Sequence, residues 1–174
     1  MTYNKSICIF RRDLRLDDNK GLLECLKQSK VVVPIFIFTP EQLVHNDYKS
    51  DNCVQFMIES LEDLSDELKK KKSRLIYLFG SPEEILRELV KEISADAIFV
   101  NMDYTPYSAK RDEKISNMCK KNGVSFESYE DILLNPIDSI KTGTGKTYSK
   151  FTPFFIKASE NKVSSPIKND HVNY

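Results

Sequence analysis

The chain has 174 residues, and its 26 lysines and arginines are balanced by 26 aspartates and glutamates. This length is enough for one domain that buries about two-thirds of its unfolded surface. The balanced charge argues against non-specific DNA binding by the chain on its own. No segment approaches the roughly 18 consecutive apolar residues of a membrane span, and the N-terminus lacks a secretory leader, so we expect neither membrane insertion nor export.

The four cysteines are dispersed along the chain without a Cys-x-x-Cys pair. Two of them lie in strongly apolar stretches, which is typical of buried, reduced thiols. The pattern predicts an intracellular, reducing compartment, either the cytoplasm or the nucleus. The two histidines, His45 and His171, have no cluster of acids or cysteines at metal-ligand spacing around them, so no metal centre is expected.

Five short runs rich in β-branched and aromatic residues alternate with segments of helical period. The runs cover residues 6–10, 31–38, 74–79, 97–101 and 124–129. This alternation is the order expected of parallel strands joined by crossover helices. The sequence therefore predicts an α/β domain built on a five-stranded parallel sheet.

The helices between these runs are predicted by their period and their caps. One long helix carries an apolar stripe at three- and four-residue steps, made of Val54, Met57, Ile58, Leu61, Leu64 and Leu68. The next helix begins with a predicted capping box, with Ser81 as the N-cap, Pro82 at the first position and Glu84 three residues after the cap. A further helix is predicted at about residues 108–122, closed by Gly123.

Two polar segments follow directly on predicted strands. Residues 11–19 form an arginine-rich bend after the first strand, and residues 101–112 follow the fourth strand with acidic, basic and tyrosine side chains. Ligands of open parallel sheets bind beyond the carboxyl ends of the strands, where the strand order reverses. We therefore predict that the two segments meet there and form a polar cleft.

The sequences of these segments resemble the photolyase/cryptochrome family. The resemblance lies in residues 10–19, in Phe-Ile-Phe-Thr-Pro at 36–40, in the helix start at 50–56, in the 103–112 loop and in Tyr-Ser-Lys-Phe-Thr-Pro-Phe at 148–154. Together these motifs span about residues 5–158. The resemblance implies a doubly wound five-stranded parallel sheet of flavodoxin-like (Rossmann-like) order with helices on both faces. It also implies a domain over residues 1–156, followed at 157–174 by a polar tail that we expect to be loosely ordered.

The family activity is that of a deoxyribodipyrimidine photo-lyase, a carbon-carbon lyase that uses light to repair DNA. In that family a much larger helical domain holds FAD and the damaged base, so DNA contact and catalysis are expected only through such a separate FAD-binding half. The chain contains no tryptophan, and the family's flavin is commonly photoreduced through tryptophans. We expect this chain to be inactive as an enzyme on its own.

The α/β domain of this family binds an antenna chromophore, a deazaflavin or a folate. By resemblance, the binding residues are expected to be Arg11, Phe36, Ile37, Phe38, His45, Cys53, Asp103, Tyr104, Tyr107 and Arg111. Aromatic and aliphatic side chains would supply walls for a planar dye, and the polar groups would fix its orientation. Cys53 occupies a position where many members of the family have an arginine.

Three other interpretations remain open. The side chains of the first bend can simply pair with one another and with strand ends. The chain can be a non-catalytic remnant or an interaction module with an empty pocket. A small nucleotide-binding α/β protein is disfavoured because the bend after the first strand is bulky instead of glycine-rich. The segment Thr-Gly-Thr-Gly-Lys-Thr at 142–147 resembles the end of a P-loop, but Ile140 replaces the first glycine.

Overall fold

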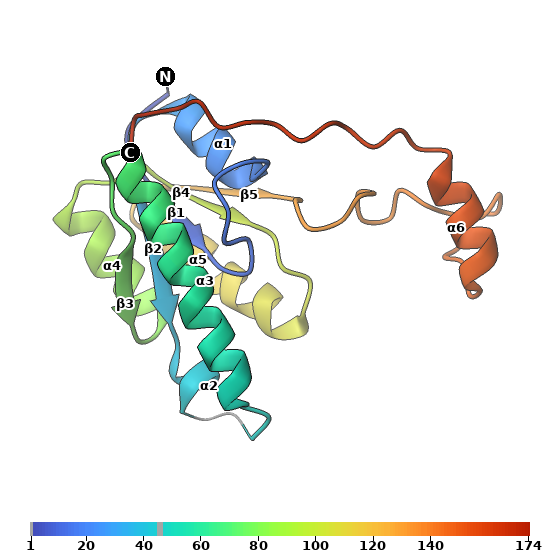
Figure 1. Cartoon of the computed structure of the whole chain (residues 1–174), viewed down its shortest axis with the longest axis horizontal. Coiled ribbons are helices and arrows are strands. Elements are labelled where there is room, and N and C mark those ends of the chain that lie inside the picture. The colour runs from blue at the N-terminus through green and yellow to red at the C-terminus, as the bar shows by residue number, and fades with distance from the viewer. Residues whose placement is uncertain (1, 45–46) are drawn as a thin grey trace.

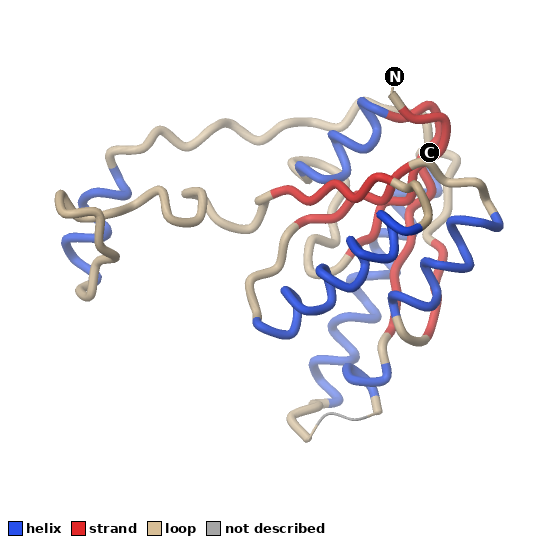
Figure 2. Tube along the Cα trace, turned by 180° about the vertical axis from the view of Figure 1, so that it is seen from behind, coloured by secondary structure: helices blue, strands red, loops and turns tan. Residues whose placement is uncertain are grey.

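A computed structural model, shown in Figures 1 and 2, describes residues 2–44 and 47–174. Its centre is a parallel five-stranded sheet with the strand order β3-β2-β1-β4-β5. The strands are β1 (Tyr3–Phe10), β2 (Ser29–Phe38), β3 (Ile76–Phe79), β4 (Ala97–Asn101) and β5 (Ser125–Tyr129). All five predicted strands are therefore present. The central strands β1, from Ser6 onwards, and β4, along its whole length, are buried, as expected when helices cover both faces of a sheet.

Helices pack on both faces of this sheet. One core lies between the sheet and α1 (Lys20–Gln28) and α3 (Asp51–Lys70), and it contains Leu22, Leu26, Phe36, Leu61, Leu64, Leu68 and Phe99. The other lies between the sheet and α4 (Pro82–Glu92) and α5 (Pro106–Lys121), and it contains Ile7, Ile35, Leu86, Val90, Ile98 and Ile115. The predicted doubly wound class is confirmed.

The strand order corrects one part of the prediction. A flavodoxin-like sheet has the order 2-1-3-4-5, whereas this sheet has the Rossmann order 3-2-1-4-5. The difference arises because β3 pairs with the outer side of β2, from Ile35 opposite Ile76 to Phe38 opposite Phe79. The connection from β3 then crosses to the other side of β1 and enters β4, which places the reversal of strand order between β1 and β4.

The predicted helices agree with the structure except at one cap and at Ile58 of the predicted α3 stripe, which is 40% exposed. Leu61, Leu64 and Leu68 of α3 are buried, with Met57 packed against the same core, and Gly123 closes α5 at a φ of 68°. Ser81 is the N-cap of α4, but its side chain makes no capping hydrogen bond, so the predicted capping box is wrong. The structure has a capping box at α2 (Pro40–Leu43) instead, where the Thr39 and Gln42 side chains bond each other's backbone N–H groups.

The chain leaves the sheet after β5 and returns at its end. Residues 132–166, here called the arm, project from the domain and include α6 (Phe151–Ser159), and residues 167–174, the return segment, lead back to the region of the N-terminus (Figure 1). None of the helices in the described residues has the length and apolar character to cross a bilayer.

The return segment is docked, so the expectation of a loosely ordered tail is wrong for these residues. Asn169 is buried, and its side-chain amide donates to Leu16 O and to the Tyr174 hydroxyl. Asn173 donates from its side chain to Leu26 O and accepts at its carbonyl from Val32 N. The sequence did not predict this contact, because asparagine side chains hold the segment by hydrogen bonds to backbone groups. Such bonds leave no hydrophobic periodicity in the sequence.

Candidate functional site

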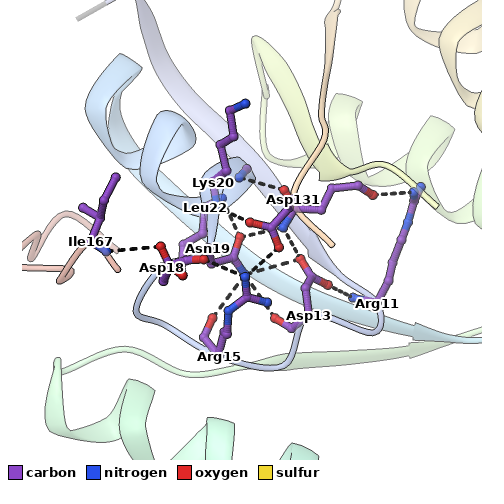
Figure 3. A network of polar contacts seen from close by, with 11 residues as sticks. Arg11, Asp13, Arg15, Asp18, Asn19, Lys20, Leu22, Asp131 and Ile167 are labelled. Atoms are coloured by element: carbon purple, nitrogen blue, oxygen red, sulfur yellow. Dashed lines mark hydrogen bonds and ion pairs between the residues drawn. The ribbon is translucent and has the colours of Figure 1, made fainter. Parts of the chain in front are cut away.

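The bend after β1 and the end of β4 are joined by a buried polar network at the switch point (Figure 3). Asn101, the last residue of β4, donates from Nδ2 to Asp13 Oδ2 at 2.5 Å and to Asn19 Oδ1 at 2.7 Å. Asn19 is the N-cap of α1, where Oδ1 also accepts from Leu22 N. All three polar side chains are at most 6% exposed. The predicted meeting of the two segments is confirmed.

Gly21 allows this close approach. Its N–H donates to Asn101 Oδ1 at 2.8 Å, and a Cβ at this position would lie only 2.6 Å from the same oxygen. A side chain would therefore push α1 away from the end of β4. The absence of a side chain at Gly21 is what lets the first turn of α1 contact β4 directly.

A chain of charged groups lies beside the network. Arg11 forms a two-pronged ion pair with Asp112, with N–O distances of 2.9 and 2.7 Å, and also donates to Asn101 O. Asp112 accepts a further hydrogen bond from Arg111 Nε at 3.0 Å. Burial, with the neighbouring charge of Arg111, lowers the pKa of Arg11 from its ordinary value. The bend and α5 are thus tied by a charge-assisted contact of the strong, bidentate kind.

Arg111 retains one unused donor. Its Nη2 atom is buried and has no hydrogen-bond partner among the described residues. The guanidinium carbon lies 6.0 Å from the centre of the Tyr107 ring. A buried cationic donor without an acceptor is costly, so the Arg111 guanidinium carries an unsatisfied donor.

Asp103 is an anion held in place in the loop between β4 and α5. Its oxygens accept from Tyr104 N at 2.8 Å and from the Ser108 hydroxyl at 3.0 Å, and Arg12 Nη1 lies 3.6 Å away. Partial burial opposes the charge, but the two hydrogen bonds and the arginines outweigh it and lower the pKa of Asp103 below its ordinary value. Asp103 is therefore a charged acceptor at neutral pH.

A cavity of about 810 Å³ opens between these loops and the start of α3. Seven of the predicted site residues line it: Arg11, Phe36, Ile37, Cys53, Asp103, Tyr107 and Arg111. Apolar walls are added by Leu14, Val54, Phe56 and Met57, and polar groups by Arg12, Thr39, Gln42 and Lys49. The volume and the mixed lining are typical of sites for small organic ligands.

Two of the predicted residues, Phe38 and Tyr104, do not line the cavity. The Phe38 ring meets the Phe36 ring edge-to-face at a centroid distance of 4.8 Å and stacks with the Tyr77 ring at 6.1 Å, so it serves packing. Tyr104 is half-buried, and its hydroxyl is buried without a partner among the described residues. Burial and the nearby Glu130 and Asp131 raise the pKa of that hydroxyl. His45 lies outside the residues that the structure describes.

The described residues contain no cluster of three or more histidines, cysteines or acids that would hold a metal ion.

A family model for DNA photolyase matches residues 6–170. The chain belongs to the DNA photolyase family.

Comparison with individual photolyases locates the domain within longer proteins. The chain is 32% identical over 145 residues to the deoxyribodipyrimidine photo-lyase of Synechococcus sp. strain PCC 6301, covering 83% of this chain and 30% of that protein. It is similar to the structure of an archaeal photolyase from Sulfolobus tokodaii, with a TM-score of 0.88, 46% identity, and coverage of 96% of this chain and 37% of that one. A class III photolyase from Agrobacterium tumefaciens gives a TM-score of 0.85, 27% identity, and coverage of 96% and 34%.

The chain therefore corresponds to the N-terminal α/β domain of photolyases and cryptochromes. It spans well under half of the length of each of these relatives. The activity of the complete photolyases is therefore a proposal for this chain.

The sequence analysis did not predict some residues of the site in this photolyase domain. The sequence placed Asn101 at the end of a strand and Asn19 in the bend, but their direct hydrogen bond depends on β1 and β4 being neighbours, which is a property of strand order. Phe56 and Gln42 line the cavity because α2 and α3 follow β2 at the same edge of the sheet. If the start of α3 had been placed at the carboxyl edge of the sheet, Phe56 and Gln42 would have been expected to line the cavity.

The structural interpretation of the first bend is correct for part of it. Asp13 bonds Asn19 and Asn101, and Arg15 pairs with Asp131 at 2.7 Å (Figure 3). Arg11 takes part in the ion pairing and also lines the cavity, and the largely exposed Arg12 lines it with Nη1 3.6 Å from Asp103. The bend therefore both joins structural elements and shapes the site.

Proposed function

We propose that the chain is the light-harvesting domain of a photolyase-type protein and that its cavity binds a planar heteroaromatic cofactor with an acidic tail. The observation that carries this proposal is that Arg111, whose Nη2 atom has no hydrogen-bond partner among the described residues, lines a cavity that also has aromatic walls. Phe36, Phe56 and Tyr107 suit the faces of a fused ring system. The Arg111 guanidinium suits a phosphate or carboxylate oxygen.

For the cofactor we propose a flavin dinucleotide first. The archaeal photolyase, 46% identical to this chain, was solved with two FAD molecules, with the implication of a novel light-harvesting cofactor. A dinucleotide carries both a planar ring and anionic phosphates, which the lining residues match. The deazaflavin and folate expected by family resemblance are the alternatives. A bound cofactor of this kind absorbs light and passes the excitation on.

We further propose that the domain works with an FAD-binding helical part, through which DNA would be bound and lyase chemistry carried out. The 26 positive and 26 negative residues of the chain support the view that DNA contact resides in that other part. Cys8, Cys25, Cys53 and Cys119 are free thiols, which supports a reducing intracellular compartment.

The competing interpretation is a domain whose cavity takes no cofactor. The observation that favours it is Cys53, which lines the cavity where many family members have an arginine. That residue also provides the test, because Cys53 is exposed while Cys8, Cys25 and Cys119 are buried. A thiol reagent therefore reports on the cavity alone.

We predict that saturating FAD slows the alkylation of Cys53 by a small maleimide at least 10-fold. Mass spectrometry after timed labelling gives the rate, and Cys53→Ser identifies the labelled site because it abolishes the rapid reaction. Parallel samples contain a 5-deazaflavin, a reduced folate, or ATP as a nucleotide without a dye. If only the deazaflavin or only the folate protects Cys53 from alkylation, that compound is the cofactor in place of FAD. Equal labelling rates in all samples would contradict the proposed function and favour the empty-cavity interpretation.

A further inference from the structure

The strand β3 leaves one edge of the sheet open. It pairs only with β2 and is the outermost strand of the order β3-β2-β1-β4-β5 (Figure 1). Gly80 N donates to Phe38 O at 2.9 Å, which fixes the register of this pairing. Successive residues of a parallel strand turn their backbone groups to opposite sides. The backbone groups of Leu78 therefore point to β2, and those of Tyr77 and Phe79 point outward.

The outward N–H and C=O groups of Tyr77 and Phe79 have no hydrogen-bond partner among the residues that the structure describes. An unpaired strand edge of this kind is a template for pairing with a further strand. Many edge strands are protected by lysine or proline, but β3 has the sequence Ile-Tyr-Leu-Phe and contains neither. The edge is therefore able to accept another strand.

The side chains of the same two residues are exposed aromatic rings. Tyr77 is 44% exposed and Phe79 is 61% exposed. Tyr77 lies on the α3 face of the sheet, where its ring stacks with Phe38 and its hydroxyl donates to Leu61 O at 3.2 Å. Phe79 lies on the same face, because side chains two residues apart in a strand point the same way. The open edge thus carries two aromatic rings, a residue type that is enriched at protein contacts.

A second copy of β3 that runs antiparallel matches this edge. When Leu78 of both copies lies on a two-fold axis, Tyr77 of each copy is opposite Phe79 of the other. The outward backbone groups of each opposed pair can then exchange two hydrogen bonds, as in any antiparallel ladder. The opposed rings lie on one face and form aromatic cross-strand pairs. Backbone and side chains are therefore satisfied by the same register.

The charges at the two ends of β3 agree with this antiparallel direction. A basic run precedes the strand, formed by Lys69, Lys70, Lys71, Lys72 and Arg74, and two acids, Glu83 and Glu84, follow it. Arg74 and Glu84 are both exposed. An antiparallel partner places the basic end of each copy beside the acidic end of the other, whereas a parallel partner would place like charges together.

We infer that β3 is the contact edge through which two copies of this chain associate, with their sheets joined across a two-fold axis. The contact is isologous, since the same surface serves both copies. A strand of four residues buries little area, so the contact belongs to the weak, transient class of interfaces. The inference is independent of the proposed function, because Arg74, Tyr77, Phe79 and Glu84 do not line the cavity.

Sedimentation equilibrium of the chain over a range of concentrations, without added cofactor, gives the Kd of the dimer. We expect a monomer–dimer equilibrium, and we expect Phe79→Lys to weaken it at least 10-fold, because a lysine in an edge strand opposes pairing. Phe151→Lys is the matched control, since Phe151 belongs to α6 and is 74% exposed. It should leave the Kd unchanged. Both variants should keep the wild-type melting temperature, because both rings are largely exposed.

An exchange of charges tests the register. Arg74→Glu alone and Glu84→Arg alone each place like charges together at both ends of the contact. Each variant should therefore weaken its own dimer about 3- to 10-fold. In an equal mixture of the two variants, a mixed dimer has opposite charges at both ends, and its Kd should return to the wild-type value.

Three outcomes would overturn the inference. The first is a wild-type chain that stays monomeric at every concentration. The second is a Phe151→Lys variant that loses association as much as Phe79→Lys, which would place the contact on the arm. The third is a mixture of the two charge variants that associates no better than either variant alone.

Discussion

Replacing Asn101 by alanine is expected to lower the free energy of unfolding by about 3–5 kcal/mol, because it leaves several buried polar groups without their partners. The Gly21 N–H loses its acceptor in a buried position. The Asp13 carboxylate, 6% exposed, loses its shortest hydrogen bond, at 2.5 Å. Each such loss costs about 1–3 kcal/mol, and more where a charge is involved.

Urea unfolding followed by circular dichroism measures this effect. Asn117→Ala is the matched control, since Asn117 lies on the exposed face of α5, and its replacement should change the stability by less than about 0.5 kcal/mol. If Asn101→Ala costs no more than this control, the network does not hold the bend against β4, and the arrangement of the site loses its structural basis.

Replacing Arg111 by methionine is expected to weaken FAD binding about 10- to 100-fold. A hydrogen bond to a charged group contributes about 1.5–3 kcal/mol, and each 1.4 kcal/mol is a factor of ten in Kd. The fold should survive, because Asp112 keeps its two-pronged pair with Arg11. Methionine also retains much of the apolar stem that arginine contributes to packing.

Two controls give this prediction its specificity. Arg87→Met removes an arginine of α4 that pairs with Glu83 on the helix surface, and it should not change FAD affinity. Riboflavin, which has the ring system without phosphates, should bind wild type and Arg111→Met with equal affinity. If Arg111→Met weakens riboflavin and FAD equally, the guanidinium does not contact the phosphates. If neither ligand is affected, Arg111 is not part of the site.

Much of the fold was predictable because its signals are local. The five strands and the stripe on α3 follow from periodicity, and Gly123 ends α5 through a conformation that its own backbone prefers. The strand order was not predictable in the same way. The outer pairing of β3 with β2 is a long-range choice, and both the flavodoxin and the Rossmann orders satisfy the same local pattern.

The site was predictable in position and less so in detail. Two segments after parallel strands had to lie at one edge, and the cavity found there contains Arg11, Asp103 and Arg111. Phe38 does not line this cavity, although it shares a face of β2 with Phe36, because its ring packs on the rings of Phe36 and Tyr77. The docking of Asn169 depends on a backbone carbonyl of Leu16 far away in sequence, which no local pattern reveals.

The most direct test of the central claim is a crystal structure of the chain grown with saturating FAD. The account predicts one flavin dinucleotide between the bend after β1 and the loop before α5, with a phosphate oxygen accepting from Arg111 Nη2. FAD bound at another surface, or a cavity that stays free of FAD at saturation, would contradict it.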